Sequence, residues 1–241
     1  MKRLLFSLLV IFTTLAAIAQ PMDRGIKKSV FMPKGQWFAG GSASYLEVTG
    51  DDYDFLMINN IEAKAFTLST KLMVGYTLSN NVAAGVSFSY DRTMVQIDNI
   101  DLSLSEDMVF GVSDYYSIQH IYTGTAFLRT YISLGDSKRF GLFNDVRFNF
   151  GAGQGKIFSG TGDEMVGTYE KITQMGMTLS PGISVFATNF MSVEASIGIL
   201  GLSYSRTEQV TNQVYEGSFE SLSANFKINL LSIALGITLY F

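Results

Sequence analysis

The chain has 241 residues, of which 47% are hydrophobic, 13% aromatic and only 16% charged. This composition excludes a disordered polypeptide, and a formal net charge of −4 argues against a nucleic-acid partner. The chain contains no cysteine, which excludes disulfide bonds and lipid attachment to cysteine.

The first twenty residues have the features of an export signal. Lys2 and Arg3 precede an apolar run that ends at Leu15, and the sequence AIA at residues 17–19 fits the small-x-small cleavage rule. An uncleaved membrane anchor is the alternative, but the run is short for a spanning helix. We therefore predict a signal peptide over residues 1–19.

Residues 20–35 show little periodicity, and we expect an N-terminal linker there, followed by one domain over residues 36–241. Within that domain apolar residues recur at every second position, as in the alternation of Val86 and Phe88 with Ser87 and Ser89. A period of two is typical of β-strands with one apolar and one polar face. We predict eight strands, at about 36–47, 63–77, 81–94, 115–133, 139–152, 169–186, 190–206 and 219–241.

The connections between these strands alternate in length. Short turns at 78–81, 134–138 and 187–189 are rich in Gly, Asn, Asp and Ser. Longer acidic stretches separate them, at 48–62, 95–114, 153–168 and 207–218. This alternation predicts an up-and-down meander with all short turns at one end and all long loops at the other.

The acidic loops raise the question of a calcium site, because hard cations prefer clustered carboxylates. The stretch DDYDFLMINNIE lacks the glycine and the acid spacing of an EF-hand, and GAGQGKIFSG lacks the spacing of a phosphate-binding loop. We therefore expect solvated loop charges, with no metal and no cofactor.

The polar faces of the strands decide which side is buried. They carry many small residues and a few charges of both signs, namely Lys71, Arg129, Asp145, Arg147 and Glu194. A surface in water would carry a denser coat of charge, whereas small residues and paired charges fit the crowded interior of an eight-stranded barrel. We therefore expect an all-β, antiparallel transmembrane barrel with its apolar rows facing lipid. The aromatic girdles expected for such a barrel would comprise Trp37, Tyr76, Tyr90, Tyr116, Tyr122, Phe190, Tyr240 and Phe241.

Arg129 and Asp145 lie on the inward faces of neighbouring strands, at matched heights above the turn at 134–138. We predict that they form an interior ion-pair network with Arg147, Glu194 and Lys71, because an unpaired buried charge costs several kcal/mol. The network would hold the strand register. A gated polar path is the alternative interpretation.

The stretch AFLRTYISLGDSKRFGLFNDVRFNFGAG (126–153), followed by LSPGISVF (179–186), resembles the small eight-stranded outer-membrane β-barrel domain proteins of the OmpX, OmpW and OmpA-barrel group. The matching residues are Phe127, Arg129, Tyr131, Leu134, Gly135, Asp145, Ser180, Pro181 and Gly182. Leu239 and the terminal Phe241 resemble the signal that the outer-membrane assembly machinery reads. Some barrels of this kind are lipid-modifying enzymes that pair a histidine with a serine two residues later. Position 122, two residues after His120, is tyrosine, so we expect no catalytic residue.

We therefore expect an integral protein of the bacterial outer membrane without catalysis, in a structural, adhesive or loop-binding role. Its loops would be extracellular and both termini periplasmic. Its partners would be outer-membrane lipids, lipopolysaccharide and the assembly machinery, while the extracellular ligand is not specified by the sequence. The main alternative is a narrow channel or lateral-gate passage for small or hydrophobic solutes. A secreted soluble barrel with an apolar ligand is a further alternative.

Overall fold

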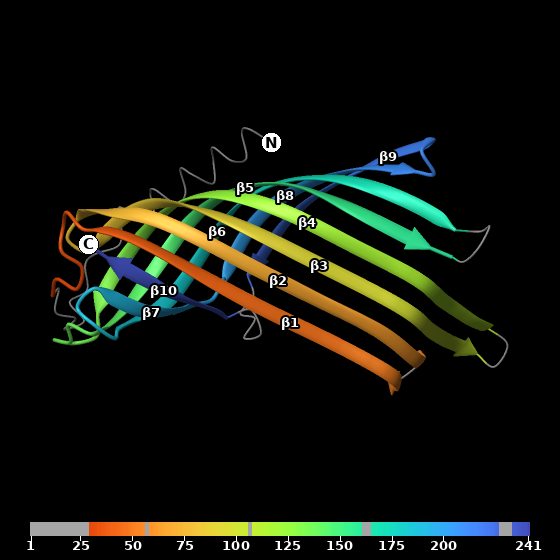
Figure 1. Cartoon of the computed structure of the whole chain (residues 1–241), viewed down its shortest axis with the longest axis horizontal. Coiled ribbons are helices and arrows are strands. Elements are labelled where there is room, and N and C mark those ends of the chain that lie inside the picture. The colour runs from red at the N-terminus through yellow and green to blue at the C-terminus, as the bar shows by residue number, and fades with distance from the viewer. Residues whose placement is uncertain (1–28, 56–57, 106–107, 161–164, 227–232) are drawn as a thin grey trace, which may run out of the picture.

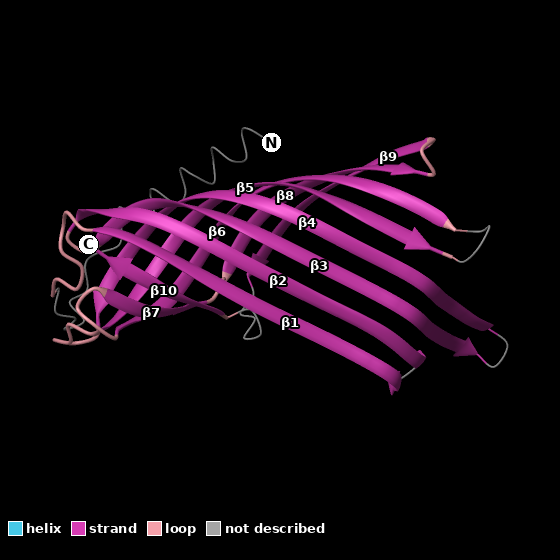
Figure 2. Ribbon diagram, in the orientation of Figure 1, coloured by secondary structure: helices cyan, strands magenta, loops and turns pink. Residues whose placement is uncertain are grey.

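A computed structural model describes residues 29–55, 58–105, 108–160, 165–226 and 233–241 of the chain. Within these residues the protein is built from antiparallel β-strands (Figures 1 and 2). The strands are β1 (Trp37–Phe55), β2 (Ile58–Ser79), β3 (Val82–Ser105), β4 (Met108–Ser133), β5 (Phe140–Ser159), β6 (Val166–Phe186), β7 (Met191–Ser196), β8 (Leu200–Thr211), β9 (Tyr215–Phe226) and β10 (Ala234–Tyr240). No helix in the described part of the chain is long and apolar enough to span a bilayer.

Eight of these strands form a closed ring, in the order β1 to β7 followed by β10. The ring closes where β10 pairs with β1, from Phe38 opposite Tyr240 to Ala43 opposite Leu235. β8 pairs with β6, and β9 pairs with β8, so these two extend the wall above the ring. The predicted eight-stranded antiparallel barrel is thus confirmed. In Figure 1 the ring is closed at the left, whereas β1 and β9 diverge towards the right.

The last two predicted strands are each divided in two. β7 and β8 are separated by residues 197–199, where the amides of Ile197 and Ile199 donate to the carbonyls of Pro181 and Leu179, each at 3.0 Å. The interruption is thus a bulge beside β6. Pro181 has no amide hydrogen, and the side of its backbone that lacks the donor faces this bulge. The prediction of a single strand over 219–241 is wrong, since β9 pairs with β8, whereas β10 pairs with β1 and β7.

The predicted long loops are also wrong in part, because the strands continue through most of them as hairpins. β3 pairs with β4 from Val82 opposite Thr130 up to Ser105 opposite Met108. β1 likewise extends to Phe55 and β2 begins at Ile58. The sequence did not indicate continuous strands there because the apolar alternation changes phase, as from Val95 and Ile97 to Ile100 and Leu102. We call this half of the molecule the hairpin end, and the half with the short connections the turn end.

The apolar rows point outward, as predicted. Along β4, the side chains of Leu128 and Ile132 are 43% and 51% exposed, whereas Arg129 between them is 1% exposed. On β5 the outward apolar row extends from Phe140 to Phe150. Ten residue steps of roughly 3.3 Å, tilted at the 35–45° usual for such strands, span about 25 Å. That height matches the hydrocarbon layer of an outer membrane. We call this outward row, on all strands, the apolar belt.

The interior of the turn end is packed with aromatic rings placed over glycines. The ring of Phe143 lies against Gly182, where an added Cβ would come within 2.3 Å of Phe143 Cζ. Phe38 lies over Gly75 in the same way. Large and small residues thus alternate between neighbouring strands, which is how the interior of a small barrel is filled. The buried cluster comprises Phe31, Met32, Phe38, Ala83, Phe127, Tyr131, Phe143 and Tyr240.

The segment before β1 packs into the mouth of the turn end. Asn81 Oδ1 accepts hydrogen bonds from the amides of Phe31 (2.8 Å) and Met32 (2.9 Å), and Asn81 Nδ2 donates to the carbonyl of Ser29 at 2.9 Å. Asn81 itself has a φ of 65°, which asparagine tolerates better than most residues. Of the expected linker at 20–35, residues 20–28 lie outside the described residues. Residues 29–35 are held against the turn end by the contacts with Asn81.

Candidate functional site

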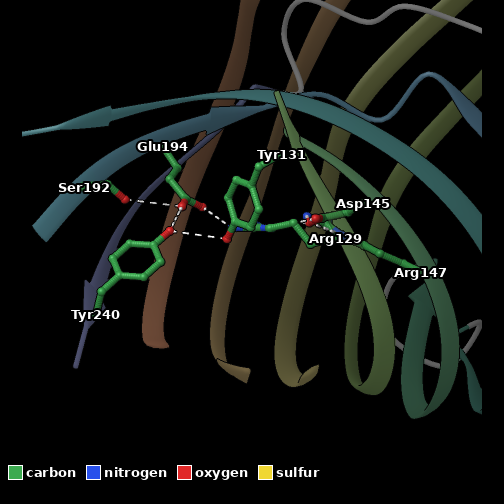
Figure 3. A network of polar contacts seen from close by, with 7 residues as sticks. All are labelled: Arg129, Tyr131, Asp145, Arg147, Ser192, Glu194 and Tyr240. Carbon is green, nitrogen blue, oxygen red and sulfur yellow. Dashed lines mark hydrogen bonds and ion pairs between the residues drawn. The ribbon is translucent and has the colours of Figure 1, made fainter. Parts of the chain in front are cut away.

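A buried polar network crosses the barrel among the rings of the aromatic cluster (Figure 3). Arg129 on β4 lies directly opposite Asp145 on β5. Arg129 Nε donates to Asp145 Oδ1 at 2.7 Å, and Nη2 donates to Oδ2 at 3.0 Å. Nη1 of the same guanidinium donates to Glu194 Oε2 on β7 at 2.8 Å. One arginine thus joins two carboxylates from different strands, with the paired geometry of strong charge-assisted bonds.

Both carboxylates have further donors. Arg147 Nη2 donates to Asp145 Oδ2 at 2.7 Å. The hydroxyl of Tyr240 donates to Glu194 Oε1 at 3.1 Å, and the hydroxyl of Ser192 donates to the same atom at 3.3 Å. Asp145 is 1% exposed and Glu194 is 5% exposed. Since these charges are removed from water, the several partners offset the cost of desolvation.

Aromatic rings enclose the guanidinium of Arg129. Its central carbon lies 4.0 Å from the centre of the Phe143 ring, and the rings of Phe38, Phe127 and Tyr131 are at 5.8–5.9 Å. A cation over aromatic faces in a desolvated site gains roughly 2 kcal/mol or more. Through one arginine, the network therefore links β4 and β5 on one side of the interior to β7 and β10 on the other.

Lys71 lies beside this network but outside its ion pairs. It lines a cavity of about 20 Å³ with Arg129, Arg147 and Glu194. Among the described residues, no acid lies within ion-pairing distance of Lys71. A space of that size holds about one water molecule, so the described side chains fill the lumen at this level. The structure thus brings together four of the five predicted network residues and places the fifth next to them.

Above the network the interior is a polar vestibule lined with hydroxyl and amide side chains. Glu170 on β6 is 5% exposed there, and its carboxylate accepts from Gln209 Nε2 at 2.6 Å and Gln119 Nε2 at 3.2 Å. Glu170 was not among the predicted interior residues. The even-numbered residues of β6 face inward, so its position on that strand would have indicated it. In the described part of the chain, no group of three or more His, Cys, Asp or Glu side chains forms a metal site. Of the acidic stretches, Glu106, Asp107, Asp163 and Glu164 lie outside the described residues.

The outward aromatic residues follow the prediction with one exception. His120 lies opposite Arg92 on the outer face, and its Nδ1 is 2.7 Å from the hydroxyl of Tyr90. Trp37 and Tyr76 are in contact at the turn end, with ring centres 5.0 Å apart and the ring planes tilted by 50°. Tyr240, expected in a girdle, is instead 5% exposed and bonded to the interior network. The prediction is wrong because the even-numbered residues of β10, such as Thr238 and Tyr240, face the interior. Nearness to a strand end does not change the face on which a side chain lies.

The C-terminus is fixed to the first strand of the ring. The amide of Phe241 donates to the carbonyl of Trp37 at 2.9 Å, and the amide of Trp37 donates to the carbonyl of Phe241 at 2.8 Å. The side chains of Leu239 and Phe241 are 43% and 72% exposed on the outer wall. Their role as an assembly signal stays a prediction.

The chain matches no protein-family model and no curated protein sequence. Among solved structures, the outer membrane protein OprG from Pseudomonas aeruginosa is similar, with 10% sequence identity and a TM-score of 0.45. The alignment covers 88% of this chain and 99% of that protein. A likeness at this level carries no argument about function, which therefore has to be argued from the residues themselves.

Proposed function

We propose that the protein is an integral, non-catalytic β-barrel of the bacterial outer membrane that presents its hairpin end outside the cell. One observation carries this proposal: a closed ring exposes an apolar belt outward and buries an ionic network inside. A barrel in water would have the reverse arrangement, and hydrocarbon requires the closed hydrogen bonding of such a ring. The first and last described residues, Ser29 and Phe241, lie at the turn end and would then be in the periplasm.

Site-directed spin labelling tests the orientation of the wall. The natural chain has no cysteine, so Val86→Cys and Ser87→Cys each introduce one labelling site, on opposite faces of β3. A label at position 86 should collide with lipid-soluble oxygen, and a label at position 87 should not. Val193→Cys and Ser196→Cys, on opposite faces of β7, form a second pair across the ring, since Val193 is 45% exposed and Ser196 lines the interior cavity. The proposal fails if the labels at 86 and 193 are shielded while those at 87 and 196 meet solvent.

The role of the barrel follows from its filled lumen. Because Arg129 and the surrounding rings close the interior, steady ion conductance in planar bilayers should be absent. We propose a structural or ligand-presenting role in which the projecting hairpins contact a partner outside the cell. Deletion of the tip of the β3–β4 hairpin should leave heat-modifiability on a gel intact while removing attachment to an extracellular surface. Persistent conductance from the intact barrel would contradict this role.

A lateral passage for apolar solutes is the second candidate, because the described strands leave two unpaired edges at the hairpin end. Among the described residues β1 pairs with β10 only from Phe38 to Ala43, and β9 pairs only with β8. Figure 1 shows β1 and β9 diverging towards the right, away from the ring. The inner rim of this opening carries Leu46 and Phe219, which are 48% and 67% exposed.

The lateral route has its own test. Uptake of a small apolar dye into liposomes containing the barrel should fall when both rim residues are made polar, in Leu46→Asn with Phe219→Asn. Leu72→Asn, which changes an outward residue of the apolar belt, serves as the control. Equal uptake by the rim variant and the natural protein would exclude passage through this opening.

A further inference from the structure

A groove lies on the outer wall of the hairpin end, separate from the interior network. It has a volume of about 530 Å³ and is lined by Lys156, Phe158, Gly167, Tyr169, Val210 and Asn212, among others. Gly167 on β6 lies opposite Phe158 on β5, and its missing side chain leaves the groove open. The backbone of Gly167 is held in place, because its amide donates to Asn212 Oδ1 at 3.1 Å and its carbonyl accepts from the Asn212 amide at 2.8 Å.

One lysine, Lys156, lines this groove, and a second, Lys171, lies just outside its lining on the same outer face. Lys156 lies opposite Tyr169, and Lys171 lies opposite Gln154, in adjacent rows of the same outer face. Among the described residues, no acid lies within ion-pairing distance of Lys156. Lys171 Nζ is 4.0 Å from Glu208, and its side chain is 69% exposed. The Tyr169 hydroxyl donates to Gln154 Oε1 at 2.9 Å, which fixes the ring between the two lysines.

The height of the groove decides which molecules can reach it. Lys156 is six residues beyond Phe150, the last residue of the apolar belt on β5. At roughly 3.3 Å per residue and a 35–45° tilt, its backbone lies about 15 Å above the hydrocarbon. Because the groove opens on the outer wall and not into the vestibule, an occupant would approach along the membrane surface. An ordinary headgroup layer is only about 5–8 Å thick, so only a headgroup built of several sugars would extend to that level.

We propose that this groove binds the phosphorylated saccharide headgroup of an outer-leaflet glycolipid. The sugar face lies against Phe158 and Tyr169, while Lys156 and Lys171 bind the phosphate groups. Apolar ring faces suit the C–H faces of a sugar, and exposed lysines suit phosphate oxygens. This inference rests on the outer-membrane proposal above, since it needs the apolar belt to lie in the bilayer.

The test is a titration of the folded barrel in detergent with phosphorylated rough-type lipopolysaccharide, counting bound copies by native mass spectrometry. Lys156→Gln combined with Lys171→Gln should weaken binding at least about tenfold. Gly167→Leu should weaken it similarly without changing the charge. An added Cβ at Gly167 meets only the Phe158 ring at 3.6 Å, so the barrel itself should tolerate a larger side chain there.

Lys64→Gln is the matched control, because Lys64 is an outward cation of the hairpin end that pairs with Glu47 at 3.3 Å on the opposite wall. It should change binding less than about twofold. Equal losses in the control and the double variant would overturn the site, as would undiminished binding by Gly167→Leu. Equal binding of dephosphorylated glycolipid, or equally tight binding of soluble glucosamine 6-phosphate, would likewise overturn it.

The two proposals fail in different ways. Every variant is first run on a gel before and after boiling. If the natural barrel shows no heat-modifiability and stays soluble without detergent, the outer-membrane proposal fails. If it is heat-modifiable but binds no phosphorylated glycolipid, only the groove assignment fails.

Discussion

The turn end and the hairpin end share the same strands but differ in how they are held together. At the turn end the ring is closed, and rings, glycines and an ionic network fill its interior. At the hairpin end the strands continue as paired ladders, and among the described residues β9 and the part of β1 beyond Ala43 each pair on one side only. The two ends thus show that backbone pairing by itself carries the strands at the hairpin end, whereas at the turn end side chains packed across the interior are added to it.

The largest expected effect comes from breaking the network at the turn end. Arg129→Ala would leave Glu194 buried without its cation and Asp145 with Arg147 alone, which should destabilise the barrel by about 3–5 kcal/mol. Urea unfolding followed by the fluorescence of Trp37, the only tryptophan of the chain, measures this change.

Arg206→Ala at the hairpin end is the matched control. Arg206 forms exposed pairs with Glu208 at 3.0 Å and Glu220 at 3.7 Å. Exposed pairs contribute about 0–1 kcal/mol, so this variant should unfold nearly as the natural protein does. If the two variants were equally stable, the network would not be what holds the turn end.

A smaller effect is expected from releasing the segment before β1. Asn81→Gly keeps the left-handed backbone geometry but removes the three hydrogen bonds to Ser29, Phe31 and Met32. At about 1 kcal/mol each, their loss should weaken the segment by about 2–3 kcal/mol. Hydrogen exchange at the amides of Phe31 and Met32 should speed up, while exchange in the hairpins stays unchanged. Unaltered protection of these two amides would show that packing of their side chains suffices.

The smallest effect compares one glycine from each end. Gly182→Ala places a Cβ 2.3 Å from Phe143 Cζ and 2.6 Å from the carbonyl oxygen of Ala195, so overpacking should cost about 1–3 kcal/mol. At Gly217 on β9 nothing lies within 4 Å, and Gly217→Ala should change stability by less than about 0.5 kcal/mol. Urea titrations of both variants, side by side, measure the difference. Equal costs at the two positions would mean that the interior of the turn end is looser than its packing indicates.

The sequence by itself determined the strand faces and much of the network. A period of two assigns each residue of a strand to one side, so Arg129, Asp145, Arg147 and Glu194 could be placed inside together with the small residues. The same parity puts His120, an even-numbered residue like Leu128, on the outer face, where it lies opposite Arg92. The same rule, applied further along β6 and β10, would have found Glu170 and moved Tyr240 inside.

Only the tertiary structure decided where the strands end and which of them meet. The apolar alternation changes phase inside the hairpins, as from Val95 and Ile97 to Ile100, Leu102 and Leu104, so their length follows from pairing with a neighbour. The bulge at 197–199 and the division between β9 and β10 likewise depend on which backbone groups find partners in other strands. The groove at Gly167 was also invisible, because a pocket between three strands depends on contacts distant in sequence, whereas alternation records only which way each residue points.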